Sequence, residues 1–235
     1  MQFPDLADRV SEARDRIAGA VARGGRGQQV TLVAVTKTFG VEAVDAAWQA
    51  GVHDVGENRV QEALDKMALA TAPVRWHLIG HLQRNKVRAA DAFELVHGVD
   101  SARLADALHE RGLARGRAID VLVEIRVAGE ETKFGWSSED VPAEAERLTG
   151  LPGVRVRGAM VMAPFGASEG VLRSTFTEAR VARDVLRVAG HPASELSMGM
   201  SNDYEVAVEE GATLVRLGTV LFGRRAFPIT GHGHD

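Results

Sequence analysis

The sequence contains no cysteine, and only one of its 235 residues is a tyrosine. The lack of cysteine excludes disulfides, cysteine-ligated zinc sites and thiol nucleophiles. The formal net charge is −4, so no broad basic field is available to bind a nucleic-acid backbone. No apolar run approaches the length of a membrane span, and the start, MQFPDLADRV, lacks the apolar core of a signal peptide. We therefore expect a cytoplasmic globular protein that binds neither nucleic acid nor membranes.

Strand-like and helix-like segments alternate along most of the chain. An amphipathic pattern predicts a first helix from Leu6 to Ala22, and apolar β-branched runs predict the strands. The predicted strands are residues 30–36, 53–57, 74–79, 94–98, 119–127, 155–162, 195–199 and 213–217. The predicted helices between them are residues 41–50, 59–70, 84–92, 101–114, 138–149, 169–189 and 202–210.

This alternation predicts parallel strands, and about eight such units in a chain of this size indicate a closed (β/α)8 barrel of the TIM type. An open, doubly wound sheet is the alternative α/β fold. No Pro-, Gly- or Ser-rich linker divides the chain, so we expect a single domain over residues 1–235. Within it, residues 1–29 form an additional N-terminal helix and loop, and residues 226–235 form a mobile tail.

Polar residues collect where the predicted strands end, which is the face that carries the chemistry in such barrels. Lys37 ends the first strand, after a run of apolar positions where an ammonium group is costly. Arg216 lies inside an apolar strand and needs a buried partner. Taken singly, Asn58 and Ser201 suit helix N-caps, and His81 suits a rim histidine without a function.

Two features favour a cofactor site. The segments SMGMSND and LGT follow the seventh and eighth strands, and their hydroxyls, small residues and backbone N–H groups suit a phosphate. A desolvated lysine has a lowered pKa and can form a Schiff base. A Schiff-base lysine opposite a phosphate site is what pyridoxal 5′-phosphate requires, and Arg216 is placed to meet its pyridine nitrogen.

Five motifs in fixed order resemble the pyridoxal phosphate homeostasis protein family, whose fold is similar to the N-terminal barrel domain of alanine racemase. They are VAVTKT, VGENRVQE, WHLIGHLQRNK, LSMGMSNDYEVAVEEGAT and VRLGTVLFG, and the resemblance covers roughly residues 30–225. It implies a protein that handles the cofactor in vitamin B6 balance without an established reaction. Arg59 departs from the family pattern, because an aromatic residue is frequent there.

The resemblance also implies roles for individual residues. Lys37 would form the Schiff base, and Asn58 would lie beside the cofactor ring with His81 and Met160 nearby. The remaining cofactor-binding residues are implied to be Ser201, Gly218 and Thr219 at the phosphate and Arg216 at the pyridine nitrogen. No metal ligand and no catalytic residue is implied.

A racemase needs a second acid/base on the far face of the cofactor, and alanine racemase takes a tyrosine from an additional domain. Here the barrel pattern ends near Gly223 with about a dozen residues remaining, and Tyr204 lies inside a predicted helix where packing is its expected role. An arginine at the pyridine nitrogen also weakens the cofactor as an electron sink. We therefore expect a monomer or weak homodimer that holds pyridoxal phosphate and has apo-enzymes as recipients.

Three alternatives remain. One is a weakly active pyridoxal phosphate-dependent amino-acid racemase, and a second is an aldolase that uses Lys37 without a cofactor. The third is a serine hydrolase, since GASEG at 166–170 matches G-x-S-x-G, but Pro164 and Phe165 separate this segment from its strand.

Overall fold

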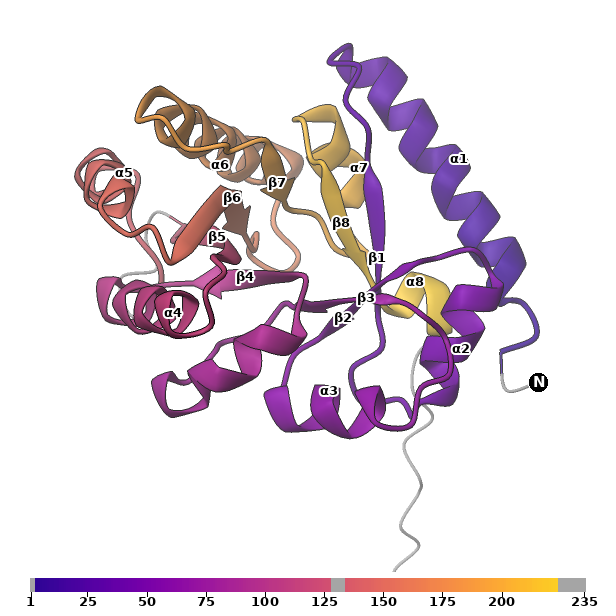
Figure 1. The fold of residues 1–235 in the computed structure, drawn as a ribbon. Helices are drawn as coiled ribbons and strands as arrows, with labels where there is room; N and C mark the ends of the chain where they lie inside the picture. The colour runs from indigo at the N-terminus through magenta and orange to yellow at the C-terminus, as the bar shows by residue number, and fades with distance from the viewer. Residues whose placement is uncertain (1–2, 128–133, 224–235) are drawn as a thin grey trace, which may run out of the picture.

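Eight parallel strands pair in chain order, and the eighth pairs with the first to close a barrel. The structure is a computed structural model that describes residues 3–127 and 134–223 (Figure 1). The strands are β1 (Thr31–Val35), β2 (Asp54–Glu57), β3 (Arg75–Leu78), β4 (Leu95–Val99), β5 (Ile119–Ile125), β6 (Val154–Val161), β7 (Glu195–Ser197) and β8 (Leu214–Leu217). The predicted (β/α)8 barrel with an additional N-terminal helix is confirmed.

Helices surround the barrel, as their amphipathic patterns predict. They are α1 (Leu6–Gly24), α2 (Glu42–Gln49), α3 (Val60–Met67), α4 (Ala102–Ala114), α5 (Val141–Thr149), α6 (Glu169–Val188), α7 (Tyr204–Glu209) and α8 (Thr219–Phe222). The segment η1 (Arg84–Ala92) is a 3-10 helix and not the expected α-helix. Its buried residues, Val87 and Ala90, are three positions apart, and this spacing places them on one face of a three-residue turn.

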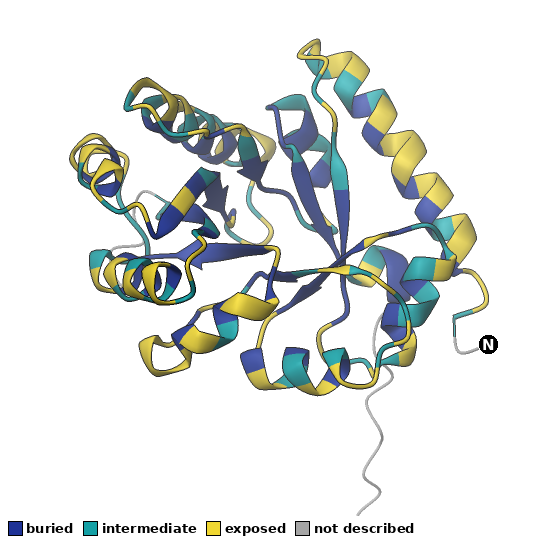
Figure 2. Ribbon diagram, in the orientation of Figure 1, coloured by how far each residue is buried: buried dark blue, intermediate teal, exposed yellow. Residues whose placement is uncertain are grey.

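The N-terminal helix covers the seam where β8 meets β1. Helix α8 has four residues, which is too short to shield two strands, and α1 packs beside it against α7 and α2 (Figure 1). The side of α1 that faces the barrel is buried and its other side is exposed (Figure 2). Its buried residues are Leu6, Val10, Ala13, Ile17 and Ala20. The extra helix thus completes the ring around the barrel.

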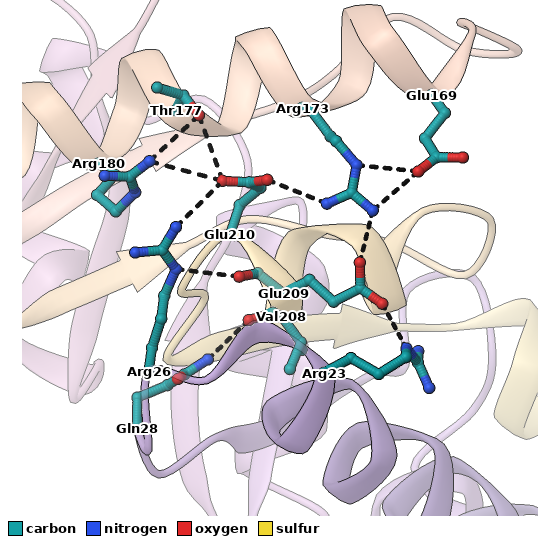
Figure 3. A network of polar contacts seen from close by, with 10 residues as sticks. All are labelled: Arg23, Arg26, Gln28, Glu169, Arg173, Thr177, Arg180, Val208, Glu209 and Glu210. Atoms are coloured by element: carbon teal, nitrogen blue, oxygen red, sulfur yellow. Dashed lines mark hydrogen bonds and ion pairs between the residues drawn. The ribbon is translucent and has the colours of Figure 1, made fainter.

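A network of charged side chains ties α7 to its two neighbours (Figure 3). Glu209 at the end of α7 accepts from Arg23 of α1 at 2.6 Å and from Arg173 of α6 at 2.6 Å. The next residue, Glu210, accepts from Arg173 at 3.1 Å, and Arg26 donates to the Glu209 carbonyl at 3.0 Å. Networks of this kind fix geometry better than isolated surface pairs do. Helix α7, which follows the predicted phosphate segment, is therefore held on both sides.

The inside of the barrel has an apolar part and a polar part. Five side chains form the apolar part: Val33, Leu95, Leu122, Met160 and Leu214. The polar part contains histidines, a serine and Arg216, and it leads into the site described below. No helix in the described part of the chain is long and apolar enough to cross a membrane. The expected mobile tail, residues 226–235, lies outside the described residues.

Candidate functional site

The structure brings the predicted site residues to one end of the barrel. Lys37, Asn58 and His81 come directly after or within three residues of the ends of β1, β2 and β3. On the other side of the mouth, Ser201 follows β7, Arg216 lies in β8, and Gly218 and Thr219 begin the segment after β8. Because all eight strands are parallel, these ends share one rim. Residues more than 180 positions apart in the chain are thereby collected around one opening.

Lys37 occupies a tight turn at the end of β1. The Phe39 N–H donates to the Thr36 carbonyl at 3.1 Å, and Thr38 has a positive φ of 70°. Thr36 is fully buried, but Lys37 itself is exposed. The expectation that the chain desolvates this ammonium group is therefore wrong, because the turn carries Lys37 past the end of the buried strand. Its amine is accessible at the mouth.

Arg216 is a buried cation whose direct partners are neutral. Its guanidinium donates to the Ser197 hydroxyl and, at 2.9 Å, to the Val161 carbonyl. Burial lowers the pKa of Arg216 to about 10, against the opposing influence of Asp203 and Glu124, so it remains charged at neutral pH. The sequence predicted a buried partner for this residue; among residues 3–127 and 134–223 its hydrogen-bond partners are a hydroxyl and a carbonyl, and no carboxylate contacts it. Within the described residues, the carboxylates of Asp203 and Glu124 therefore act on this charge without a direct hydrogen bond.

A chain of hydrogen bonds continues from Ser197 through the barrel to its opposite end. The Ser197 hydroxyl lies 2.8 Å from His97 Nδ1, and His97 Nε2 lies 3.0 Å from His77 Nδ1. His77 Nε2 lies 2.9 Å from Asp54 Oδ1, and Arg75 holds the same carboxylate through two nitrogens. Burial would raise the pKa of Asp54, but hydrogen bonds from His77 and Arg75 lower it to about 2.

The ionised Asp54 carboxylate sets the direction of this chain. A carboxylate only accepts, so His77 Nε2 carries the hydrogen of their bond. Burial keeps the pKa of His97 well below its usual value, so His97 is neutral and has one N–H. When His77 is neutral as well, His97 Nε2 donates to it, and the Ser197 hydroxyl must donate to His97 Nδ1. The Ser197 oxygen is then free to accept from Arg216, which fixes the position of the guanidinium.

The loops at the ends of strands β2 to β5 pack closely against one another at the rim. A side chain at Gly80 would meet the Asn58 carbonyl at 2.3 Å, so only glycine allows the loop before His81 to approach Asn58. A side chain at Gly98 would lie 3.2 Å from Glu124 Oε2 and 3.3 Å from the Gly80 carbonyl. The ends of β2, β3, β4 and β5 therefore press against one another. Asn58 is exposed at this rim and free to face a ligand.

An acidic group lies across the mouth from Lys37. Glu124, near the end of β5, is partly buried, and burial together with the neighbouring Asp100 raises its pKa to about 7, against the opposing influence of Arg216 and His81. His81 is hydrogen-bonded through Nδ1 to Asp100 at 2.7 Å and stacks on Phe134. Glu124 was not among the site residues predicted from the sequence. It could have been found from the sequence, because it is a charged residue inside the apolar strand segment LVEI, and Arg216 was identified by the same pattern.

The two segments predicted to bind phosphate contact each other. The Val220 N–H donates to the Ser201 hydroxyl at 3.3 Å, which joins the segment after β7 to the start of α8. Gly199 has a φ of 91°, and a side chain there would lie 2.9 Å from the Tyr204 Cα. This glycine lets the first segment fold closely onto α7. Ser201 is partly exposed and Thr219 is exposed, so both hydroxyls lie where a ligand can reach them.

Met160 lies deeper in the barrel than the other predicted site residues. Met160 is 99% shielded from solvent within the apolar part of the barrel interior, so it offers a ligand an apolar floor and no polar group. His77, which is not one of the predicted cofactor-binding residues, belongs to the buried hydrogen-bond chain. Sequence reasoning did not single out His97, although a histidine within the apolar run LVHGV was the available signal.

Comparisons with known proteins agree with this architecture. The chain matches the family model for the alanine racemase N-terminal domain over residues 14–226. It is 41% identical over 227 residues to the pyridoxal phosphate homeostasis protein of Aquifex aeolicus (strain VF5), covering 95% of this chain and 100% of that protein. The protein of the same name from Escherichia coli (strain K12) is 37% identical over 232 residues, covering 95% and 98% of the two chains.

Comparison with solved structures also finds relatives with this fold. PipY from Synechococcus elongatus PCC7942, solved with pyridoxal phosphate bound, has a TM-score of 0.82 and 37% identity, over 93% of this chain and 100% of PipY. An alanine racemase from Clostridium difficile 630 shares the fold, with a TM-score of 0.69 and 16% identity over 91% of this chain and 58% of that one. The resemblance predicted from five motifs is thus confirmed: the chain belongs to the pyridoxal phosphate homeostasis protein family, which is built on the barrel of the alanine racemase N-terminal domain.

Proposed function

We propose that this protein binds pyridoxal 5′-phosphate at the mouth of the barrel and holds it as a Schiff base on Lys37, in the homeostasis of the cofactor. The observation that carries the proposal is that an accessible amine, Lys37 in the turn after β1, and a buried cation, Arg216 on the adjacent strand β8, lie at the same end of the barrel. The proposed cofactor-binding residues are Lys37, Asn58, His81, Met160, Ser201, Arg216, Gly218 and Thr219.

The residues present fit the parts of this cofactor. The hydroxyls of Ser201 and Thr219, on two segments joined through Val220, suit the phosphate. At Gly218 an added Cβ would reach ordinary contact with Val35, at 3.6 Å, so a larger side chain would fill the space beside β1. The Arg216 guanidinium donates only, and it suits the unprotonated pyridine nitrogen as an acceptor. Support also comes from PipY, the relative that was solved with the cofactor bound.

With the cofactor bound, the accessible amine of Lys37 would be the group that condenses with its aldehyde, with loss of one water. When bound, the cofactor supplies an electron sink for carbanion chemistry, and its strength depends on protonation of the ring nitrogen. A cation at that nitrogen opposes its protonation. Arg216 therefore favours holding the cofactor over using it, and we propose that turnover is negligible and that apo-enzymes are the recipients. The relatives' shared name, which describes homeostasis, supports this choice.

A weakly active amino-acid racemase is the second candidate, and one observation favours it. Glu124 lies across the mouth from Lys37, and a carboxyl group with a pKa of about 7 suits general acid/base chemistry near neutral pH. The test is solvent deuterium exchange at Cα of alanine and other amino acids by the cofactor-loaded protein. Exchange on the order of 1 per second or faster, with racemisation followed in parallel, would favour the racemase and refute the holding function.

Borohydride reduction tests the proposed function directly. The loaded protein should show the visible absorption of a protonated Schiff base, and reduction should attach the label to Lys37. Lys37→Ala should abolish both signals, while Lys86→Ala, a change at an exposed lysine of η1, should leave both intact. An aldolase acting without cofactor would show no visible band. Attachment of the label to another lysine would refute the assignment of Lys37.

A further inference from the structure

Behind Lys37 lies a buried charged cluster formed by Glu57, Glu62 and Lys66, which the proposed site does not use. Lys66 extends from α3 toward the ends of β1 and β2, and only 7% of its side chain is exposed. Its ammonium group donates to Glu57 Oε1 at 2.6 Å and to Glu62 Oε1 at 2.8 Å. We call these three side chains the Lys66 cluster. We propose that the Lys66 cluster is a positioning device for Lys37, an inference that rests on the proposed function.

The cluster holds both peptide groups that flank Lys37. On one side, Lys66 Nζ donates to the Thr36 carbonyl at 2.8 Å, which belongs to the peptide group before Lys37. On the other side, the Thr38 N–H donates to Glu62 Oε1 at 2.6 Å, and this N–H belongs to the peptide group after Lys37. The Thr36 hydroxyl adds a third bond, to Glu57 Oε1 at 2.6 Å. The backbone on either side of the lysine is therefore fixed, while its side chain remains free.

The turn adopts a conformation that its residues would not choose alone. Thr38 has a φ of 70°, a region in which a β-branched residue is a genuine outlier. The third position of a turn of this kind usually holds glycine or asparagine. Such strain persists only where the surroundings over-determine the backbone, and it gathers at functional sites. The charge-assisted bond from Thr38 to Glu62 supplies that constraint.

The carboxylate of Glu62 is ionised in this setting. Burial would raise the pKa of Glu62, but the hydrogen bonds from Lys66 and from the Thr38 N–H lower it overall. Glu62 is also the cluster member that can be removed with least damage, because 26% of its side chain is exposed and Lys66 keeps Glu57. Removing it deletes the acceptor for the peptide group after Lys37 and leaves the rest of the cluster paired.

The test compares Glu62→Ala with a matched control, Glu144→Ala, which removes a buried helical carboxylate paired with Arg147 on α5. The first measurement needs no cofactor: hydrogen exchange of the Thr38 amide should accelerate in Glu62→Ala and stay unchanged in the control. The second is the rate at which added pyridoxal 5′-phosphate becomes attached to Lys37, followed by absorbance and borohydride labelling. We expect it to fall about tenfold or more in Glu62→Ala, the loss typical of one hydrogen bond to a charged group.

Glu62→Gln keeps an acceptor for the Thr38 N–H and should recover part of the rate, which a general loss of stability would not produce. An unchanged rate in Glu62→Ala would overturn the positioning role, even if amide exchange accelerates. An equal fall in Glu144→Ala would overturn it as well. If the wild-type protein is labelled at another lysine, the proposed function fails, and the wild-type measurement identifies that case before any variant is compared.

Discussion

Lys66 and Arg216 are both buried cations, but the protein surrounds them with different acceptors. All three hydrogens of the Lys66 ammonium are used, two by carboxylates and one by a carbonyl. Arg216 contacts a hydroxyl and a carbonyl, and the carboxylates of Asp203 and Glu124 act on it only from a distance. Lys66 therefore contacts two carboxylates, whereas Arg216 contacts none among the described residues and would, in the proposed function, face the bound cofactor.

This difference agrees with a structural role for Lys66 and with the ligand-binding role proposed for Arg216. A buried charge without a contacting counter-charge costs stability, and proteins retain such charges mainly where function needs them. The neutral chain behind Arg216, through Ser197 and His97, orients the guanidinium without neutralising it. The Lys66 cluster neutralises its cation and uses the bonds to hold a backbone turn. Four predictions follow from this contrast, from the largest expected effect to the smallest.

Lys66→Met should cause the largest loss of stability, because Lys66 is the buried cation with a structural role. It leaves Glu57, which is fully buried, without its cation, and stranding a buried charge in this way typically costs about 3–5 kcal/mol. The free energy of unfolding, measured by urea denaturation at pH 7, should fall by that amount. The double variant Lys66→Met/Glu57→Gln removes both charges and should recover most of the loss. A single variant that loses less than about 1 kcal/mol would contradict the account.

Arg216→Met should destabilise the protein less, although the residue is equally buried. Only neutral partners, Ser197 and the Val161 carbonyl, lose a bond, and a buried unsatisfied neutral group costs about 1–3 kcal/mol. The same denaturation measurement, without cofactor, compares the two single variants directly. A loss as large as that of Lys66→Met would show that Glu124 or Asp203 depends on Arg216 as a direct counter-charge, and the contrast would fail.

Glu124→Gln should change stability in a pH-dependent way. The folded pKa, about 7, lies above the ordinary value of 4.5, so the stability gained from holding the proton is complete below pH 4.5 and lost as the pH rises through 7. Facing groups are Asp100, which raises this pKa, and Arg216 and His81, which lower it. At pH 8 the variant should exceed wild type by about 2–3 kcal/mol, since it lacks the buried charge and a pKa difference of one corresponds to about 1.4 kcal/mol. Urea denaturation of both proteins at pH 5 and pH 8 tests this prediction. An equal difference in stability between variant and wild type at the two pH values would contradict the raised pKa of Glu124.

Thr38→Gly should have the smallest effect. Glycine adopts the positive φ of this position without a steric penalty, but it also gives the unfolded chain more freedom. The two contributions oppose each other, so we expect a change within about 1 kcal/mol in the free energy of unfolding. Attachment of pyridoxal phosphate to Lys37 should stay close to wild type, because the bonds to Lys66 and Glu62 use only backbone atoms of the turn. A loss above about 2 kcal/mol would indicate a structural role for the Thr38 side chain.

Much of the fold was predictable because its signals are local. All eight strands lie within two residues of their predicted bounds, since apolar β-branched runs bounded by turns identify buried strands. The segment 84–92 was assigned the wrong helix type because its buried residues, Val87 and Ala90, are too few to distinguish the two periods. The position of α1 over the seam of β8 and β1 could not be predicted from the sequence either. It depends on the short length of α8, which leaves this part of the barrel for α1 to cover.

The site divides in the same way. The sequence by itself determined that Lys37, Asn58, Ser201 and Arg216 follow or end buried strands, and parallel strands carry such positions to one rim. Only the tertiary structure decided that Lys37 is exposed, that Arg216 has neutral partners, and that the Lys66 cluster holds the Lys37 turn. The physical reason is that burial and hydrogen-bond partners depend on contacts between residues far apart in the chain, which only barrel closure brings together. Ser197 and His97, for example, are 100 residues apart in the chain.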